Sequence, residues 1–265
     1  MINIVVFNWN YGRFLSCLLN KMIPIFNDER FRIFICDDGS TDNSLEIIKK
    51  YIVDYSLNNL IIVESEIINL GRDKPFLGQI ENLNKVIKDY RVDKDDYYWL
   101  MDADDYFDFS LVDSDFYQKI TSKMITFTKV KNISDSGESY LKIKRNVLDS
   151  KSVFPTISVT SSIIFSGNFL SLYYDEIFTE KFNDLWLDSR INMLACLLSK
   201  ENVAYINEYI CRVIHADNDS GNMSLSRFVR KQIVAYRYFK YINKGRIMMH
   251  PRMLFISVMS KCLNV

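Results

Sequence analysis

The stretch Tyr97-Tyr98-Trp99-Leu100-Met101-Asp102-Ala103-Asp104-Asp105 passes from aromatic and apolar side chains directly into three carboxylates. A short apolar run bounded by polar residues is typical of a strand that is buried on both faces of a sheet. The first aspartate of the run marks the end of that strand. In open α/β sheets, ligands bind beyond the carboxyl ends of parallel strands, so this is a candidate binding edge.

Earlier in the chain, similar apolar runs alternate with stretches of helical spacing. We predict strands over residues 2–7, 31–36 and 60–63, and helices over residues 13–26, 45–55 and 78–90. Crossovers of this length join parallel neighbours. The alternation therefore predicts an α/β fold with a mixed, mainly parallel sheet flanked by helices.

The pattern changes after residue 108. There we predict strands over residues 124–130 and 158–165, a turn at 135–138, and a closing pair of short strands over 203–206 and 209–214. Amphipathic spacing predicts helices over residues 186–199 and 224–241. No internal repeat or low-complexity tract is visible in the sequence.

Two of the predicted strands end in carboxylates, Asp37-Asp38 after the second strand and residues 102–105 after the fourth. Clustered carboxylates repel one another unless a cation or a ligand compensates. Oxygen ligands without a nearby His or Cys suit Mg²⁺ or Mn²⁺. For Asp37-Asp38-Gly39-Ser40, a solvated turn with helix caps is the alternative. The spacing of the carboxylates alone leaves the donor chemistry open.

The 265 residues carry no net formal charge, but their 33 basic and 33 acidic side chains are unevenly distributed. Residues 223–265 contain nine Lys and Arg and no Asp or Glu, which leaves residues 1–222 with 24 basic and 33 acidic side chains. An acidic body with a basic tail predicts two different partners. The length fits one large α/β domain with an appendage.

The five cysteines are odd in number and include no Cys-x-x-Cys pair, which disfavours a disulfide framework or a structural zinc site. The N-terminus lacks the basic and apolar segments of a signal peptide. No apolar run reaches the length of about 18 residues that predicts a transmembrane helix. We therefore expect a cytoplasmic protein with reduced thiols.

Six segments, in order along the chain, resemble the inverting family-2 glycosyltransferases of the GT-A fold, which is Rossmann-like. Residues 4–15 are similar to that family's opening strand and first helix, and residues 36–42 match its Asp-Asp-Gly-Ser-Thr-Asp. Asn69-Leu70-Gly71 and residues 78–82 resemble its Asn-x-Gly loop and the helix that follows. Asp102-Ala103-Asp104-Asp105 is a typical form of its Asp-x-Asp motif.

The last two segments lie in the second half of the chain. Leu187-Asp188, followed by a helix and by residues 204–208, resembles the family's Glu-Asp pair, helix and Tyr-Ile-Asp-Glu strand. Residues 211–220 resemble its Tyr-Arg-x-His, followed by Asn and Ser. At three positions the chain departs from the family: Phe7 stands in place of Pro, Glu81 in place of Arg, and Leu187 in place of Glu.

The resemblance implies roles for particular residues. Asp188 is the implied catalytic base, and Asp184 is an acidic alternative one helical turn earlier. Asp104 and His215 are the implied ligands of a Mn²⁺ or Mg²⁺ cofactor. The residues implied in binding the nucleotide sugar are Phe7, Trp9, Asp38, Arg72, Asn82, Asp102 and Ala103.

The resemblance also implies the domains and the reaction. Residues 1–222 would form the GT-A catalytic domain, with a nucleotide-binding half at 1–106 and an acceptor-binding half at 107–222. The implied reaction moves a sugar, with inversion, from a nucleotide-diphosphate sugar, UDP-sugar favoured, to a hydroxyl of a glycan or lipid-linked acceptor. Its implied setting is the synthesis of a bacterial surface polysaccharide such as capsule, O-antigen or lipooligosaccharide.

Two other functions remain open from the sequence. One is a catalytically inactive GT-A-fold protein that binds sugars or assists assembly. The replacement of the family's Glu by Leu187 favours it, and the retention of Asp38, Asp102, Asp104, Asp188 and His215 disfavours it. The other is a nucleotidyltransferase, which is disfavoured because a Gly-rich basic phosphate loop is missing near the first strand.

Residues 223–265 are the predicted basic, amphipathic helical tail. One interpretation is peripheral contact with the anionic inner-membrane surface, where a lipid-linked acceptor would reside. The other is packing on the acidic catalytic body, with the charges solvated. The tail contains no recognised nucleic-acid motif, so nucleic acid is not expected as a partner.

Overall fold

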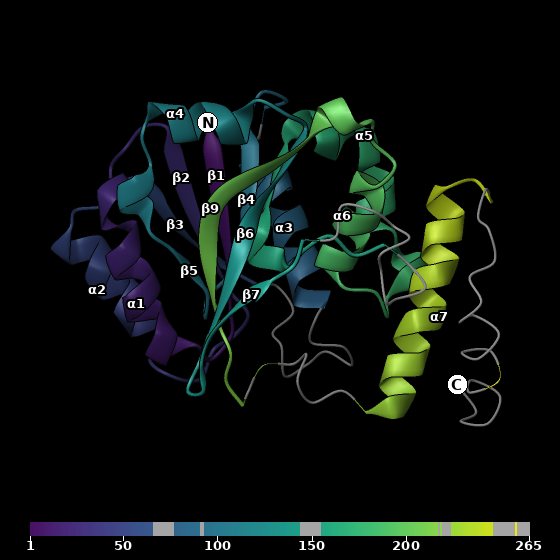
Figure 1. The fold of residues 1–265 in the computed structure, drawn as a ribbon. Coiled ribbons are helices and arrows are strands. Elements are labelled where there is room, and N and C mark those ends of the chain that lie inside the picture. Colours follow the sequence, from purple (N-terminus) through teal and green to yellow (C-terminus); the bar gives the residue numbers. More distant parts are fainter. Residues whose placement is uncertain are drawn as a thin grey trace.

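The computed structural model describes residues 1–65, 77–90, 93–143, 155–216, 218, 224–245 and 258. In this part of the chain one nine-stranded sheet has the order β3-β2-β1-β4-β8-β6-β9-β5, with β7 paired to β6 (Figure 1). The strands are β1 (Ile2–Asn8), β2 (Phe31–Asp37), β3 (Leu60–Glu64), β4 (Tyr97–Asp102), β5 (Tyr106–Phe107), β6 (Ile125–Ser134), β7 (Gly137–Leu141), β8 (Ile163–Ser166) and β9 (Val203–Val213). The α-helices are α1 (Gly12–Met22), α2 (Ser44–Asp54), α3 (Leu77–Asp89), α4 (Ser114–Thr121), α5 (Gly167–Phe178), α6 (Leu187–Ala195) and α7 (Leu225–Ile242).

The first four strands form a continuous parallel part of the sheet. β1 lies between β2 and β4, and β3 pairs with β2, all in parallel register. β8 then pairs antiparallel with β4, and β6 antiparallel with β8. The predicted mixed α/β architecture with helices on both faces is confirmed.

Alternate residues of the buried strands belong to two apolar clusters, one on each face of the sheet. On β4, Trp99 and Met101 pack with residues of α1, while Tyr98 and Leu100 pack with residues of α3. All four side chains are buried. A strand covered on both faces has few polar positions before its end, which explains the continuous apolar run seen in the sequence.

The second half of the chain differs from the prediction in several elements. The two short strands expected over 203–206 and 209–214 are one strand, β9, which follows β6 in parallel with a register shift near Phe127. That irregularity absorbs the polar residues between the two apolar runs, so the strand continues. The strand expected over 158–165 begins only at Ile163, after a 3₁₀ turn at Thr160–Ser162. α4, α5 and β7 were not predicted.

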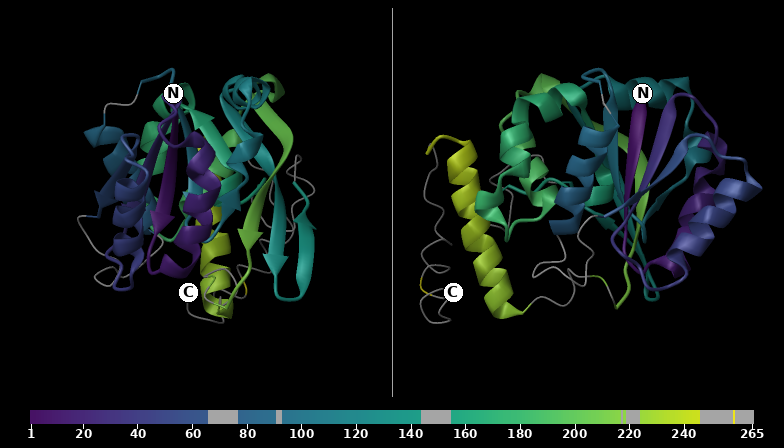
Figure 2. Two further views of the ribbon diagram at one scale, coloured as in Figure 1. Left: turned by 90° about the vertical axis from the view of Figure 1, so that its left-hand side faces the viewer. Right: turned by 180° about the vertical axis from the view of Figure 1, so that it is seen from behind.

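The helix α7 packs on the rest of the fold, outside α5 and α6 (Figures 1 and 2). Its Val229, Ala235 and Tyr238 are buried against Leu185 and Met193. One face of residues 225–242 therefore packs on the rest of the fold, while residues 246–257 and 259–265 lie outside the described part. No helix in the described residues is both long and apolar enough to cross a membrane.

Candidate active site

The carboxyl ends of β1, β2 and β4 meet at one edge of the sheet. Phe7 on β1 lies opposite Cys36 on one side and Asp102 on the other, and Asn8 lies opposite Asp37. The two acidic strand ends identified in the sequence therefore lie at the same edge, as predicted.

Three carboxylates lie together after β4. Oxygen atoms of Asp102, Asp104 and Asp105 are all within 4.8 Å of one another, which makes this a group that could hold a metal ion. Asp104 and Asp105 are buried. Burial, followed by the repulsion of Asp104 and Asp105, raises the pKa of Asp102 well above its usual value, and Asp188 adds to this effect.

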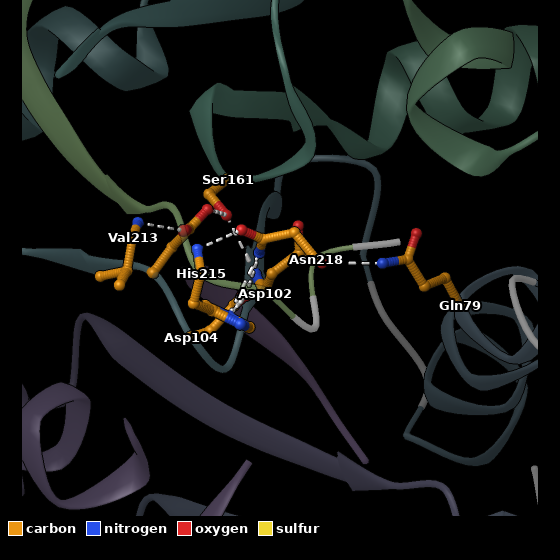
Figure 3. A network of polar contacts seen from close by, with 8 residues as sticks. Gln79, Asp102, Asp104, Ser161, Val213, His215 and Asn218 are labelled. Carbon is orange, nitrogen blue, oxygen red and sulfur yellow. Dashed lines mark hydrogen bonds and ion pairs between the residues drawn. The ribbon is translucent and has the colours of Figure 1, made fainter. Parts of the chain in front are cut away.

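The side chain of Asp105 is held by two hydrogen bonds. Its Oδ2 accepts from Ser161 Oγ at 2.6 Å, and its Oδ1 accepts from the backbone N–H of Val213 at 3.1 Å. Burial, with Asp104 as the next cause, still raises the pKa of Asp105 to about 8. Ser161 Oγ also accepts from the backbone N–H of Asp102 at 3.0 Å, so this one hydroxyl joins both ends of the acidic run (Figure 3).

His215 reaches the cluster from the segment that follows β9. Its Nε2 is 2.9 Å from Asp104 Oδ2, and Asn218 Nδ2 donates to the same oxygen at 3.0 Å (Figure 3). Asn218 Oδ1 in turn accepts from the backbone N–H of His215 at 2.7 Å. The imidazole stacks on Phe14 with 4.6 Å between ring centroids and meets the edge of Tyr11 at 5.8 Å. The predicted metal ligands Asp104 and His215 are therefore brought together.

Asp37 organises the loops beside the cluster. Its carboxylate accepts from Asn8 Nδ2 at 2.7 Å and from the backbone N–H of Ser40 at 2.9 Å. Asp38 is also buried, and its backbone N–H donates to Asn8 O at 2.9 Å. Trp9 follows Asn8 directly, and its Nε1 is buried without a hydrogen-bond partner in the described part of the structure. The geometry thus assigns Asp37 to holding together the loops that carry Trp9 and Asp38.

Asp188 lies in the first turn of α6, where its Oδ1 accepts from the backbone N–H of Ser189 at 2.6 Å. It is not one of the three clustered carboxylates, but its negative charge contributes to raising the pKa of Asp102. The electrostatic effect on Asp102 places Asp188 near the cluster, on the helix that begins at Leu187.

The remaining predicted residues occupy varied positions. Ala103 is fully buried, and its backbone N–H donates to Phe7 O at 3.0 Å, so these two contribute backbone to the edge. Asn82 on α3 is buried and accepts from Ser65 Oγ at 2.6 Å. Arg72 lies outside the described residues.

Three residues of the site were missed from the sequence. Gln79 Nε2 donates to Asp102 Oδ1 at 2.7 Å, and Asn218 and Ser161 make the contacts described above (Figure 3). Gln79 and Asn218 both lie inside segments that carry the family resemblance, so that signal was present. Ser161 follows an irregular stretch, and its partners are more than 50 residues away in sequence.

Solved structures with a similar fold include three that contain a nucleotide or a nucleotide sugar. TarS residues 1–349 from S. aureus, in complex with UDP-GlcNAc, has a TM-score of 0.54 at 15% identity, over 85% of this chain and 62% of that chain. The mannosyltransferase PcManGT from Pyrobaculum calidifontis, with GDP-Man and Mn²⁺, has a TM-score of 0.51 at 10% identity, over 100% of this chain and 80% of that one. GalNAc-T7 with UDP, GalNAc and Mn²⁺ has a TM-score of 0.57 at 10% identity, over 100% of this chain and 55% of that one.

At these identities the likeness establishes the fold alone, and the chain spans about three fifths of the length of the TarS fragment. Among curated proteins, none is similar enough in sequence to count as a match. A sequence model of one family, Glycosyl transferase family 2, matches residues 4–172. That stretch holds Asp38 and the whole acidic cluster and ends before Asp188. The match covers more than half of the chain, and the chain has a GT-A-like sheet with acidic strand ends. The chain therefore belongs to glycosyl transferase family 2.

Proposed function

We propose that this chain is an inverting, metal-dependent glycosyltransferase that transfers a sugar from a nucleotide-diphosphate donor to a hydroxyl acceptor. The observation that carries the proposal is the carboxylate cluster at the carboxyl edge of the sheet, in which Asp104 and Asp105 are buried, with Asp188 on α6 near enough to raise the pKa of Asp102. Membership of the family supports the reaction class. The single-displacement mode, the metal and the acceptor are the proposed parts.

The residues present fit a divalent cation of the Mg²⁺ or Mn²⁺ type. Three carboxylates converge in a buried place, where their mutual repulsion is unfavourable without a positive charge. Oxygen donors with one imidazole suit these cations. The Nε2 of His215 and Oδ2 of Asp104, 2.9 Å apart, are close enough to share either a proton or a cation. We therefore assign Asp104 and His215 to holding the metal, with Asp102 beside them.

In the proposed mechanism, Asp188 removes the proton of the acceptor hydroxyl while that oxygen attacks the anomeric carbon from the side opposite the leaving diphosphate. A positioned base of this kind contributes about 10²–10⁴-fold to the rate. A bound divalent cation supplies charge stabilisation to the departing nucleotide diphosphate. Asp38 and Trp9 hold the nucleobase of the donor, by hydrogen bonding and stacking. One displacement inverts the anomeric configuration, and no covalent sugar–enzyme species is required.

Structural neighbours support a nucleotide-sugar donor, because they were solved with UDP, UDP-GlcNAc and GDP-Man. We favour a UDP-sugar, and a glycan or lipid-linked acceptor in the synthesis of a bacterial surface polysaccharide. The alternative of an inactive sugar-binding or assembly protein makes the opposite forecast about turnover, so a single assay separates the two.

The proposed reaction is tested by incubating the chain with Mn²⁺ and a panel of UDP- and GDP-sugars and measuring the nucleotide released. We expect release from one donor above all others, and anomeric inversion in the product by NMR. No release from any donor, with nucleotide binding intact, would favour the inactive protein. Release with retention of configuration would contradict the single displacement.

The exposed face of α7 supports peripheral contact with an anionic membrane surface. Arg230, Arg237 and Lys240 are exposed there. So are Leu225 and Phe228, which expose 58% and 45% of their surface. The opposite face packs on the rest of the fold, so α7 can lie between the fold and a membrane surface, with its basic face toward the membrane.

Membrane contact predicts that the triple variant Arg230→Glu, Arg237→Glu, Lys240→Glu loses affinity for phosphatidylglycerol vesicles. Each basic residue near such a surface contributes about 1 kcal/mol, so the loss is on the order of 10²-fold. Co-sedimentation measures it, with phosphatidylcholine vesicles as the neutral comparison. The matched control reverses the exposed lysines 49, 50 and 123 elsewhere on the molecule. Equal loss in both variants would contradict a role for this face.

A further inference from the structure

The helix that carries Asp188 also carries a fully buried carboxamide. Asn192 is 0% exposed, and its Oδ1 accepts from the backbone N–H groups of Ile157 at 2.8 Å and Ser158 at 2.9 Å. Its Nδ2 donates to Ser158 O at 2.9 Å and to Asp188 O at 2.7 Å. A carboxamide has two amide protons and two lone pairs on its oxygen, so every bonding position of this group is used.

The partners of Asn192 belong to a segment without regular structure. Residues 155–159 lie in no helix or strand. Their buried backbone groups need partners from elsewhere, because an unpaired buried amide is unfavourable. Satisfying this backbone is the simplest role for Asn192, and it would serve the fold alone. The other end of the same segment gives the contact a second consequence.

Three residues after Ser158, the segment reaches the carboxylate cluster. Ser161 Oγ accepts from Asp102 N–H at 3.0 Å and donates to Asp105 Oδ2 at 2.6 Å. Its carbonyl accepts from Trp99 Nε1 at 3.0 Å. The residues between are tightened by a 3₁₀ turn, in which Ser162 N–H donates to the carbonyl of residue 159 at 3.1 Å. The segment is thus fixed to α6 at one end and to the acidic run at the other.

We infer that Asn192 is a positioning residue that fixes the separation between Asp188 and the carboxylate cluster through residues 158–161. The inference rests on the proposed function, because it matters only if Asp188 acts on a molecule bound at the cluster. The side chains that the link adds, those of Asn192 and Ser161, are neutral and buried, so they add no charge near the four carboxylates Asp102, Asp104, Asp105 and Asp188. Positional errors of about 1 Å in a reacting group cost on the order of 10²-fold in rate, which sets the expected effect.

The test compares Asn192→Leu with Asn3→Leu. Both side chains are fully buried, but Asn3 lies at the amino end of β1, at the opposite edge from the cluster, where its Nδ2 donates to Tyr97 O at 3.3 Å. In Asn192→Leu we expect faster hydrogen exchange at the amides of Ile157 and Ser158. We expect kcat for the donor found in the release assay to fall about 10²-fold. The KM for that donor and the Kd for its nucleotide with Mn²⁺ should stay within a few-fold of wild type.

Asn3→Leu should lose stability without a comparable fall in kcat. If Asn192→Leu does not fold, Asn192→Asp replaces it, because that carboxylate still accepts from the N–H groups of Ile157 and Ser158 but no longer donates to Ser158 O or Asp188 O. The inference would be overturned if the Asn192 variant showed faster amide hydrogen exchange but kept the wild-type kcat. It would also be overturned if kcat and nucleotide affinity fell together. A wild-type chain that releases nucleotide from no donor overturns the proposed function itself, which is a separate result.

Discussion

Asp188→Asn is expected to reduce transfer by about 10²–10⁴-fold while leaving metal-dependent nucleotide binding intact. The substitution removes the negative charge and the ability to take a proton, but Asn keeps an oxygen that can accept from the Ser189 backbone N–H, as Asp188 Oδ1 does at 2.6 Å. The start of α6 should therefore be preserved. Single-turnover transfer and isothermal titration with the nucleotide measure the two effects separately.

The charge of Asp188 sharpens this expectation. It is one of the causes that raise the pKa of Asp102, so its removal should favour the ionised form of that carboxyl. Metal-dependent nucleotide affinity should then stay equal or rise slightly. The control is Asp184→Asn, the nearby acidic residue outside α6, for which we expect wild-type turnover. Transfer that survives in Asp188→Asn and fails in Asp184→Asn would move the base to Asp184.

The acidic strand ends could be located from the sequence because they depend on local signals. A buried parallel strand such as β4 is continuously apolar, and it stops where carboxylates begin. Parallel pairing then places Asp37 and Asp102 at one edge without further information. His215 and Asp188 were predicted as functional residues through the family resemblance, because no local sequence pattern at either position indicates a functional role.

The supporting residues could not be found in this way. Ser161 and Asn192 act across 56 and 35 residues of sequence, through a segment with no regular period. Helix α5 was missed, although Ser166 caps it through the Phe169 N–H, because it begins directly after β8 without a loop to mark it. β9 was predicted as two strands because its apolar runs are interrupted by the polar residues at 207 and 208. Each of these outcomes depends on packing between distant elements.

The two halves expected at 1–106 and 107–222 share one sheet, since β4 pairs with β8 across that boundary. The site is built from both: the carboxylates and Trp9 come from the first, and Ser161, Asp188 and His215 from the second. A division into a nucleotide-binding half and an acceptor-binding half remains a prediction about ligands. The shared sheet gives the two halves a common framework in which the proposed catalytic base, Asp188, can be held at a fixed distance from the proposed metal ligands.

The metal-free protein is expected to lose stability as the pH rises from about 5 to 8. An Asp carboxyl in the unfolded chain has a pKa of about 3.9, whereas burial raises the pKa of Asp105 to about 8. Between these values the folded state holds a proton that the unfolded state has lost, so the free energy of unfolding falls with rising pH. Asp102, whose pKa is also raised, acts in the same direction. Thermal unfolding in EDTA at a series of pH values measures the effect.

Mn²⁺ should reverse this loss, and more strongly at pH 8 than at pH 6, because a cation binds the ionised carboxylates and stabilises only the folded state. Asp105→Asn is the matched variant: its amide can donate to Ser161 Oγ and its oxygen can accept from Val213 N–H, so both contacts of Asp105 are retained. It should flatten the pH dependence of the metal-free protein. Asp104→Ala should instead abolish the stabilisation by Mn²⁺. A Mn²⁺ effect that is equal at both pH values, or that survives in Asp104→Ala, would show that the cation binds elsewhere. Protonation of the carboxyl groups would then be what relieves the repulsion within the cluster.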